Sequence, residues 1–166
     1  MVEPTKYYLQ PGYIFISKEP YLIHTVLGSC VSVCLWDSVL KFGGMNHFIY
    51  SHHSDVRTGR YGDVAIPYLI RLMQKHGSDL KNLKAHLIGG AESIQLNSMV
   101  GRVNAKLAEE LLQKYQIEVV TRDLGGHNGR KVIFNNLSGE ILIYKVNNIR
   151  ESDWYNGTEA NKSFNN

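Results

Sequence analysis

The sequence has only two cysteines, and these two cannot pair with each other. Cys30 and Cys34 lie in an apolar, β-branched run at residues 26–36 of the 166-residue chain. Four residues of strand span about 13 Å, whereas a disulfide joins Cα atoms about 4.4 to 6.8 Å apart. We expect two separate thiols in a reducing cytoplasm, which excludes a small secreted fold that depends on disulfides.

The chain also lacks a long apolar run and a dominant charge. Its apolar runs are too short to cross a bilayer, and its first residues are polar, so we expect neither membrane insertion nor export. The 18 basic and 15 acidic residues give a net charge of +3. Because the Lys and Arg residues are scattered along the sequence, we expect no binding of nucleic acid.

Apolar patterning predicts a single domain of mixed α/β type. Amphipathic periodicity predicts helices over residues 61–76 and 101–115. Strands are predicted at residues 21–27, 31–36, 42–50, 85–88, 117–121, 131–134 and 140–146. We interpret residues 1–20 as a polar lead-in and residues 147–166 as a weakly ordered tail. The domain then covers residues 1–146, with a core of about 11–146. Helices cover the faces of sheets that are built mostly from antiparallel hairpins.

One constellation in this pattern suggests chemistry. Cys30 follows a Gly-Ser pair where two predicted strands meet, and such a bend exposes backbone N–H groups that can hold an oxyanion. With a two-residue turn at 38–39, the residue numbers of each cross-strand pair add up to 77. His47 then lies opposite Cys30, with Cβ atoms about 4.5 to 5.5 Å apart. An imidazole there would take the thiol proton and lower the pKa of the thiol. The pattern therefore predicts a nucleophilic Cys–His pair.

Two other interpretations stay open for these residues. Cys30 and His47 are alternatively ordinary core residues, and a bulge in the glycine pair at 43–44 would turn His47 to the opposite face of its strand. A zinc site is the rival chemistry, with Cys30, Cys34, His47, His52 and His53 as the available ligands. Two cysteines about 13 Å apart on one strand cannot both bind one ion, which argues against zinc.

Two glycine pairs interrupt the chain after predicted strands. Gly89-Gly90 and Gly125-Gly126 have neither the spacing of a dinucleotide fingerprint nor a Walker lysine. We expect tight turns there, which let a substrate chain lie across the sheet edge. With Gly28 and Ser29, these four glycines are the predicted rim for substrate and oxyanion.

Six short motifs together resemble one protein family. They lie at residues 25–35 (TVLGSCVSVCL), 43–47 (GGMNH), 61–63 (YGD), 88–91 (IGGA), 101–104 (GRVN) and 123–130 (DLGGHNGR). Their order is similar to that in CheD, the chemoreceptor glutamine deamidases of bacterial chemotaxis, over about residues 11–146. The resemblance implies a three-layer α/β sandwich related to the catalytic domain of the cytotoxic necrotizing factor toxins. It also implies cofactor-free, metal-free conversion of receptor glutamines to glutamate.

The resemblance also implies site residues and partners. Cys30 is the expected nucleophile and His47 its partner. CheD proteins commonly have a catalytic threonine six positions before the cysteine, where this chain has His24, while Thr25 lies five positions before it. The third residue is therefore Thr25 or His24. The implied partners are the cytoplasmic helices of methyl-accepting chemotaxis receptors and a CheC-type phosphatase. The irregular His24 motivates an alternative function, a binding module with weak or no catalysis.

Overall fold

The computed structural model describes residues 2–93 and 95–147, and in these it contains nine strands, two α-helices and one short 3₁₀ helix. In chain order the elements are β1 (Thr5–Tyr8), β2 (Ile14–Ser17), β3 (Tyr21–Leu27), β4 (Val31–Asp37), β5 (Phe42–Asn46), α1 (Gly62–Lys75), η1 (Leu80–Asn82), β6 (Leu83–Gly89), α2 (Val100–Lys114), β7 (Glu118–Leu124), β8 (Gly129–Asn135) and β9 (Ile141–Val146). Apart from Asn147, the predicted tail lies outside the described residues.

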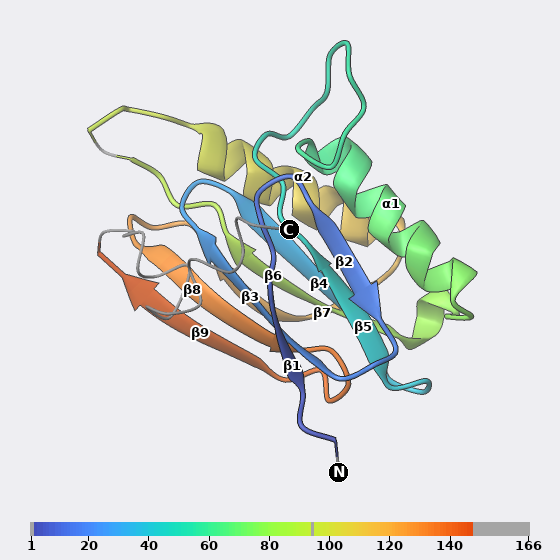
Figure 1. Ribbon diagram of the computed structural model, residues 1–166. Coiled ribbons are helices and arrows are strands. Elements are labelled where there is room, and N and C mark those ends of the chain that lie inside the picture. Colours follow the sequence, from blue (N-terminus) through green and yellow to red (C-terminus); the bar gives the residue numbers. More distant parts are fainter. Residues whose placement is uncertain (1, 94, 148–166) are drawn as a thin grey trace.

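The strands form two sheets (Figure 1). A four-stranded sheet has the order β1-β3-β8-β9, and a five-stranded sheet has the order β2-β5-β4-β6-β7. The pairs β1-β3 and β6-β7 are parallel, and the other neighbouring pairs are antiparallel. The expectation of mostly antiparallel sheets with two helices is therefore confirmed.

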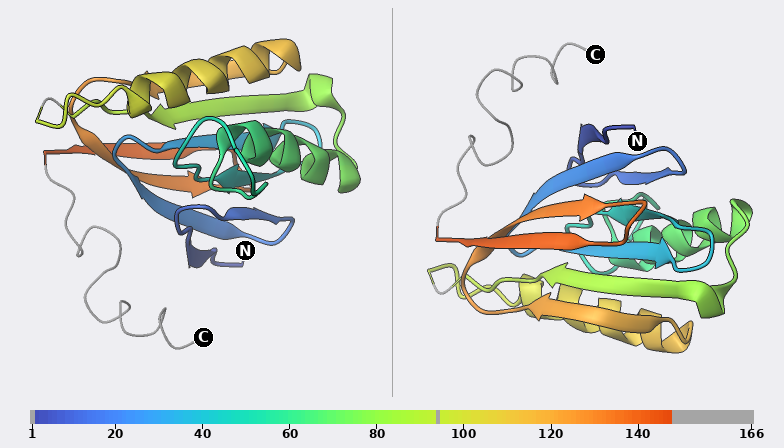
Figure 2. Two further views of the ribbon diagram at one scale, coloured as in Figure 1. Left: turned by 90° about the horizontal axis from the view of Figure 1, so that it is seen from above. Right: turned by 90° about the horizontal axis from the view of Figure 1, so that it is seen from below.

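Strand β4 shows how the chain builds two cores. Its alternate side chains Val31, Val33 and Leu35 pack into one hydrophobic cluster with α1 and α2, whereas Cys34 packs into a second cluster with residues of β3 and β8. Both helices contact the five-stranded sheet, and the four-stranded sheet covers its other face. The layers are thus helices, sheet and sheet, and β1 and α2 lie on opposite sides of the molecule (Figure 2).

The first twenty residues contradict the predicted polar lead-in. They contain β1 and β2, which pair with β3 and β5, and Leu9 is completely buried between the sheets. These strands have only four residues each, and prolines interrupt the sequence around them. Their stability comes from pairing with strands distant in sequence, which local patterning does not reveal.

The turn between β4 and β5 is longer than predicted. It has four residues, 38–41, and Lys41 adopts a left-handed backbone conformation with φ of 57°. The buried carboxylate of Asp37 accepts hydrogen bonds from the N–H groups of Val39 and Leu40 at 2.9 and 2.8 Å. This Asx-type turn stabilises the longer loop. The residue numbers of each cross-strand pair therefore add up to 79, as in Cys34 with Met45, and the predicted value of 77 is wrong.

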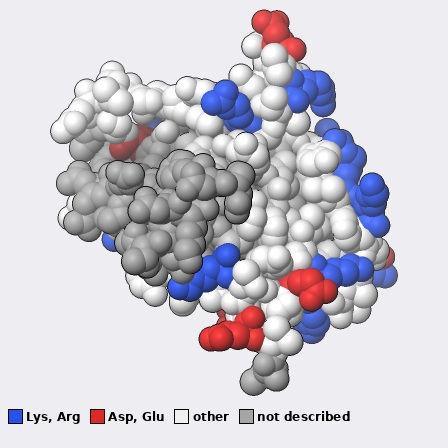
Figure 3. Space-filling model, in the orientation of Figure 1, with Lys and Arg blue, Asp and Glu red and all other residues white. Residues whose placement is uncertain are grey.

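Charged side chains do not divide the face shown in Figure 3 into regions of one sign. On the face in Figure 3, both signs are present outside the grey region, and most of the remaining surface is uncharged. Among residues 2–93 and 95–147, neither helix has the length and apolar character needed to cross a bilayer.

Candidate active site

Cys30 lies where the chain crosses from one sheet to the other. Strand β3 of the four-stranded sheet ends at Leu27, and β4 of the five-stranded sheet begins at Val31. The side chain of Cys30 is partly exposed and packs against the hydrophobic cluster between the sheets. The crossing therefore brings a thiol to the edge of the interface between the sheets, where a substrate can reach it.

Hydrogen bonds hold this crossover by its carbonyl groups. All three carbonyl oxygens accept one: Gly28 O from Ala91 N at 3.0 Å, Ser29 O from Asn104 Nδ2 at 3.0 Å, and Cys30 O from Gly90 N at 2.9 Å. The N–H of Cys30 lowers the pKa of its own thiol, although the opposing effect of burial is larger. Because the peptide group between Ser29 and Cys30 is planar and trans, its N–H points away from Asn104.

The predicted rim glycines differ in what they do. Gly89 has φ of 113°, and a Cβ there would lie 2.2 Å from the carbonyl oxygen of Cys30. Only glycine permits both the conformation and the close approach. Gly125 and Gly126 also have positive φ, but a Cβ on either would have nothing within 4 Å. The first pair is packed against the crossover, and the second is an open turn.

His47 follows the end of β5 and is buried, with 1% of its surface exposed. Its backbone pairs with the segment before β2, accepting from Gly12 N at 2.7 Å and donating to Tyr13 O at 3.2 Å. The corrected register sets His47 opposite Ser32, so Cys30 is its diagonal neighbour rather than its direct partner. A shift of two residues preserves the face of the strand, so both side chains still face the other sheet.

Thr25 supplies the contact that organises His47. The Thr25 Oγ1 to His47 Nδ1 distance is 2.7 Å, and the same hydroxyl donates to Leu9 O at 2.9 Å. A threonine hydroxyl has one hydrogen, which Leu9 O takes, so it accepts a hydrogen bond from Nδ1–H. In the neutral imidazole the basic nitrogen is then Nε2.

His24 lies on the other face of β3. Successive strand side chains alternate, and its ring packs against that of Tyr8 with centroids 5.0 Å apart. Thr25 points into the space between the sheets, where Ile23 and Leu27 lie. Of the two predicted third residues, Thr25 is the one hydrogen-bonded to His47.

Burial keeps both titratable groups of the site neutral. Desolvation raises the pKa of the Cys30 thiol to about 11, although its own backbone N–H opposes this. Desolvation lowers the pKa of His47 to about 3. The expected lowering of the thiol pKa is therefore wrong: at neutral pH the site holds a thiol and a neutral imidazole.

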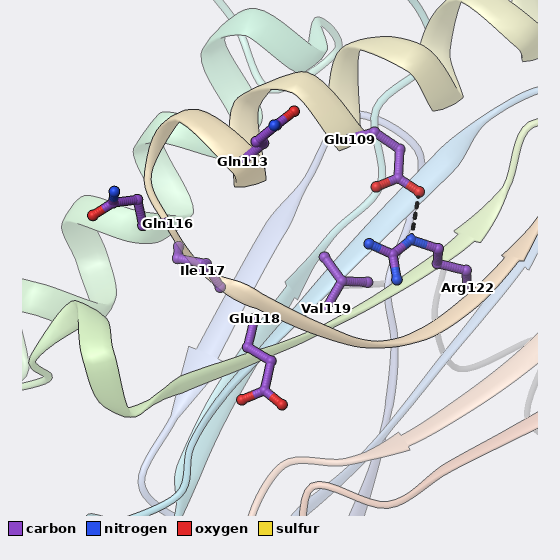
Figure 4. Close-up of a pocket in the computed structure, with 7 residues that line it drawn as sticks. All are labelled: Glu109, Gln113, Gln116, Ile117, Glu118, Val119 and Arg122. Atoms are coloured by element: carbon purple, nitrogen blue, oxygen red, sulfur yellow. Dashed lines mark hydrogen bonds and ion pairs between the residues drawn. The ribbon is translucent and has the colours of Figure 1, made fainter.

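A cavity of about 480 Å³ adjoins the crossover. Its lining includes Gly28, Ser29, Ala91, Leu96 and His127, so it extends from the turn before Cys30 toward the loop between β6 and α2. A cavity of about 570 Å³ lies instead between the end of α2 and β7 (Figure 4). It is lined by a Glu109–Arg122 ion pair and other residues distant in sequence from Cys30, and none of the predicted site residues is among them.

The residues of the zinc alternative are dispersed. Cys34 is fully buried between the sheets, His52 is exposed, and His53 pairs with Asp63 at 2.7 Å. Within the described part of the chain, no three His, Cys, Asp or Glu side chains form a group that could hold a metal ion.

Three residues that support the candidate active site were not predicted from the sequence. Leu9 offers only a backbone carbonyl, which no side-chain pattern reveals. The side-chain Oδ1 of Asn46 accepts a hydrogen bond from Val33 N–H at 2.9 Å and so replaces a strand hydrogen bond just before His47. Asn104 is a buried amide on the apolar face of α2. A polar residue on an apolar stripe was the available signal for Asn104.

We predict unequal costs for alanine at the two glycine pairs. Gly89→Ala combines left-handed strain with overlap against Cys30 O, so it should reduce the free energy of unfolding by at least about 3 kcal/mol. Gly125→Ala has the strain alone and should cost about 1 kcal/mol. Urea unfolding of both variants measures the difference, and equal costs would contradict the packing described for Gly89.

The burial of His47 predicts acid sensitivity. Its pKa is about 3 in the folded protein against 6.5 for the ordinary group, so between these values the unfolded chain binds the extra proton. Stability is therefore lost as pH falls, by about 2 kcal/mol between pH 7 and pH 5. His86, whose pKa burial also lowers, adds a loss of the same sign. His47→Gln should show a smaller decrease than the wild type in urea unfolding at both pH values. An identical decrease would refute the assignment.

Comparison with known proteins identifies the family. The family model described as CheD chemotactic sensory transduction matches residues 49–145. A protein of Sulfurimonas denitrificans named as a probable chemoreceptor glutamine deamidase CheD is 35% identical over 87% of this chain and 97% of its own length.

Two further relatives are also named as probable chemoreceptor glutamine deamidases. The protein of Trichlorobacter lovleyi is 39% identical over 83% of this chain and 89% of its own length. One from Anaeromyxobacter dehalogenans is 42% identical over 84% of each chain. With a family model that matches more than half of the sequence and relatives aligned over most of their length, this chain belongs to the CheD family.

Proposed function

We propose that this protein is a chemoreceptor glutamine deamidase that converts receptor glutamine side chains to glutamate through a thioester on Cys30. The relatives are named for this activity. The observation that carries the proposal is the chain of hydrogen bonds from Leu9 O through Thr25 Oγ1 to His47 Nδ1, at 2.9 and 2.7 Å. It orients an imidazole beside a partly exposed thiol, as nucleophilic cysteine catalysis requires.

The first step forms the thioester. Sγ of Cys30 attacks the amide carbon of the substrate glutamine while Nε2 of His47 takes the thiol proton. The N–H of Cys30 stabilises the oxyanion of the tetrahedral intermediate. When the C–N bond breaks, the imidazolium returns the proton to the leaving nitrogen and ammonia departs. Cys30 is left acylated and His47 is neutral again.

The second step releases glutamate. Nε2 of His47 takes a proton from a water molecule, whose oxygen attacks the thioester carbon. Collapse of this intermediate breaks the C–S bond, and the sulfur recovers the proton from the imidazolium. The net reaction consumes one water and yields one carboxyl group and one ammonia. Each turnover adds a negative charge to the receptor and uses no cofactor.

The neutral pair explains why His47 acts as a general base. Burial holds the pKa of Cys30 near 11 and that of His47 near 3, so the thiolate–imidazolium pair is costly before attack. Proton transfer therefore accompanies formation of the C–S bond. Once the substrate is bound, the positive imidazolium and the negative oxyanion form together and stabilise each other.

The surroundings of Cys30 suit a protein substrate. The 480 Å³ cavity beside Gly28 and Ser29 is open rather than enclosed by the core, and it includes exposed Leu96. A glutamine on a receptor helix can enter from this side while the helix remains in solvent. We propose the cytoplasmic helices of chemoreceptors as the partner, and the open loop at Gly125 and Gly126 lies near the same rim. We propose the cytoplasm as the compartment, in keeping with two free thiols.

Two expectations from the family resemblance remain part of this proposal. One is a relation to the catalytic domain of the cytotoxic necrotizing factor toxins, which the arrangement of helices, sheet and sheet supports. The other is a CheC-type phosphatase as a second partner.

A receptor-binding or phosphatase-binding module with weak or no catalysis is the second candidate function. The observation in its favour is the raised pKa of Cys30, because a resting thiol is a poor nucleophile. A module of this kind would bind a receptor fragment without changing its mass.

Mass spectrometry of a chemoreceptor cytoplasmic fragment separates the two candidates. The wild-type protein should release ammonia and raise the mass of a glutamine peptide by about 1 Da per site, and Cys30→Ala should lower this rate at least about 1,000-fold. Cys34→Ala is the matched control and should retain activity, since Cys34 is fully buried between the sheets. Binding without a mass change in the wild type would favour the module, and full activity of Cys30→Ala would exclude the proposed nucleophile.

A further inference from the structure

Asn104 connects helix α2 to the two segments that carry Cys30 and His47. It is completely buried, and its Nδ2 donates to Ser29 O at 3.0 Å and to Ile49 O at 2.8 Å. Both partners are carbonyl oxygens, so only the amide nitrogen can face them, and the orientation of the amide is fixed. One side chain thus binds the residue before Cys30 and the second residue after His47.

The contact with Ser29 determines where the N–H of Cys30 points. The Ser29 carbonyl and the Cys30 N–H belong to one peptide group, which is planar and trans, so they point in opposite directions. The hydrogen bond from Asn104 holds the carbonyl toward α2. The N–H is thereby held on the other side of the peptide group, away from α2.

Helix α2 comes unusually close to the crossover at this point. A Cβ on Gly101 would lie 2.2 Å from Ala91 O, and a Cβ on Gly90 would lie 2.7 Å from Gly101 O. Gly90 and Ala91 are also the residues whose N–H groups bind the carbonyls of Cys30 and Gly28. The absence of side chains at these glycines lets the first turn of the helix approach, so Asn104 reaches Ser29 directly.

The amide is not arranged for stability alone. Its Oδ1 is buried, and within the described residues no hydrogen-bond partner reaches it. A buried acceptor without a partner lowers the stability of the fold. The two hydrogen bonds that Nδ2 donates in spite of this loss point to a role beyond packing. We propose that Asn104 is a positioning residue that orients the Cys30 N–H as the oxyanion donor of the deamidation reaction. This inference rests on the proposed function of Cys30.

Asn104→Leu tests the inference, because leucine has a similar size and donates no hydrogen bonds. With the cytoplasmic receptor fragment as substrate, we expect kcat to fall roughly 10- to 100-fold with KM within about twofold of the wild type. Alkylation of Cys30 by iodoacetamide, followed by mass spectrometry of the Cys30 peptide, should stay within about twofold. Alkylation forms no oxyanion and depends on the Cys30 N–H only through the effect of that N–H on the thiol pKa, which is smaller than the effect of burial, so it should change far less than kcat.

Asn136→Leu is the matched control. Asn136 is also completely buried, and its Nδ2 donates to Ser17 O at 2.8 Å and Glu19 O at 2.9 Å, at the end of β3 away from Cys30. It should lose stability and keep kcat. If Asn104→Leu does not fold, Asn104→Ala, which leaves more room, is measured in the same way below its melting temperature.

Three results would overturn the inference. They are an unchanged kcat in a folded Asn104 variant, an increase in KM alone, and a parallel loss of deamidation and alkylation, which would show general damage to the site. Cys30→Ala is assayed beside these variants. If Cys30→Ala is inactive while the Asn104 variants keep full kcat, only the positioning role fails. Activity in Cys30→Ala would reject the proposed function itself.

Discussion

The hydrogen bond between Thr25 and His47 is the interaction on which the rest of the site depends. It joins β3 of the four-stranded sheet to the end of β5 in the five-stranded sheet, beside the crossover that carries Cys30. Strand β1 pairs with β3, and this pairing places the carbonyl oxygen of Leu9 beside Thr25. Leu9 O accepts the hydroxyl hydrogen, which leaves the threonine oxygen as an acceptor for His47. The packing of two sheets thus sets the tautomer of one imidazole.

Burial and orientation have opposite effects on the reactivity of Cys30 and His47. Removing Cys30 and His47 from water makes each one less able to carry charge in the resting protein. The same low-dielectric surroundings strengthen interactions with charge that develops beside His47 during the reaction. A fixed donor and a fixed tautomer then contribute more to stabilising the transition state than a thiolate in the resting protein would. The hydrogen-bonded carbonyls of the crossover are consistent with this design, since they hold the backbone in place before the substrate arrives.

The sequence predicted the parts of the fold that are encoded locally. Strand β3 lies at the predicted residues, and α1 and α2 lie within one residue of the predicted ranges. The register of β4 with β5 was wrong by two residues because the Asp37 carboxylate stabilises a four-residue turn. Contacts between distant segments, such as those of Leu9 and Asn104, depend on how the layers pack, which no local pattern specifies. The choice between Thr25 and His24 likewise required the face of β3 to be known.

Nitrogen-15 chemical shifts of the His47 ring, measured by NMR in the intact protein from pH 7 toward pH 4, report which ring nitrogen carries the proton. We expect a neutral ring over this range with the proton on Nδ1 and none on Nε2, because Thr25 accepts from Nδ1 and burial opposes protonation. A proton on Nε2 in the neutral ring, or an imidazolium at pH 7, would rule out the orientation of His47 by Thr25 and its role as a neutral base.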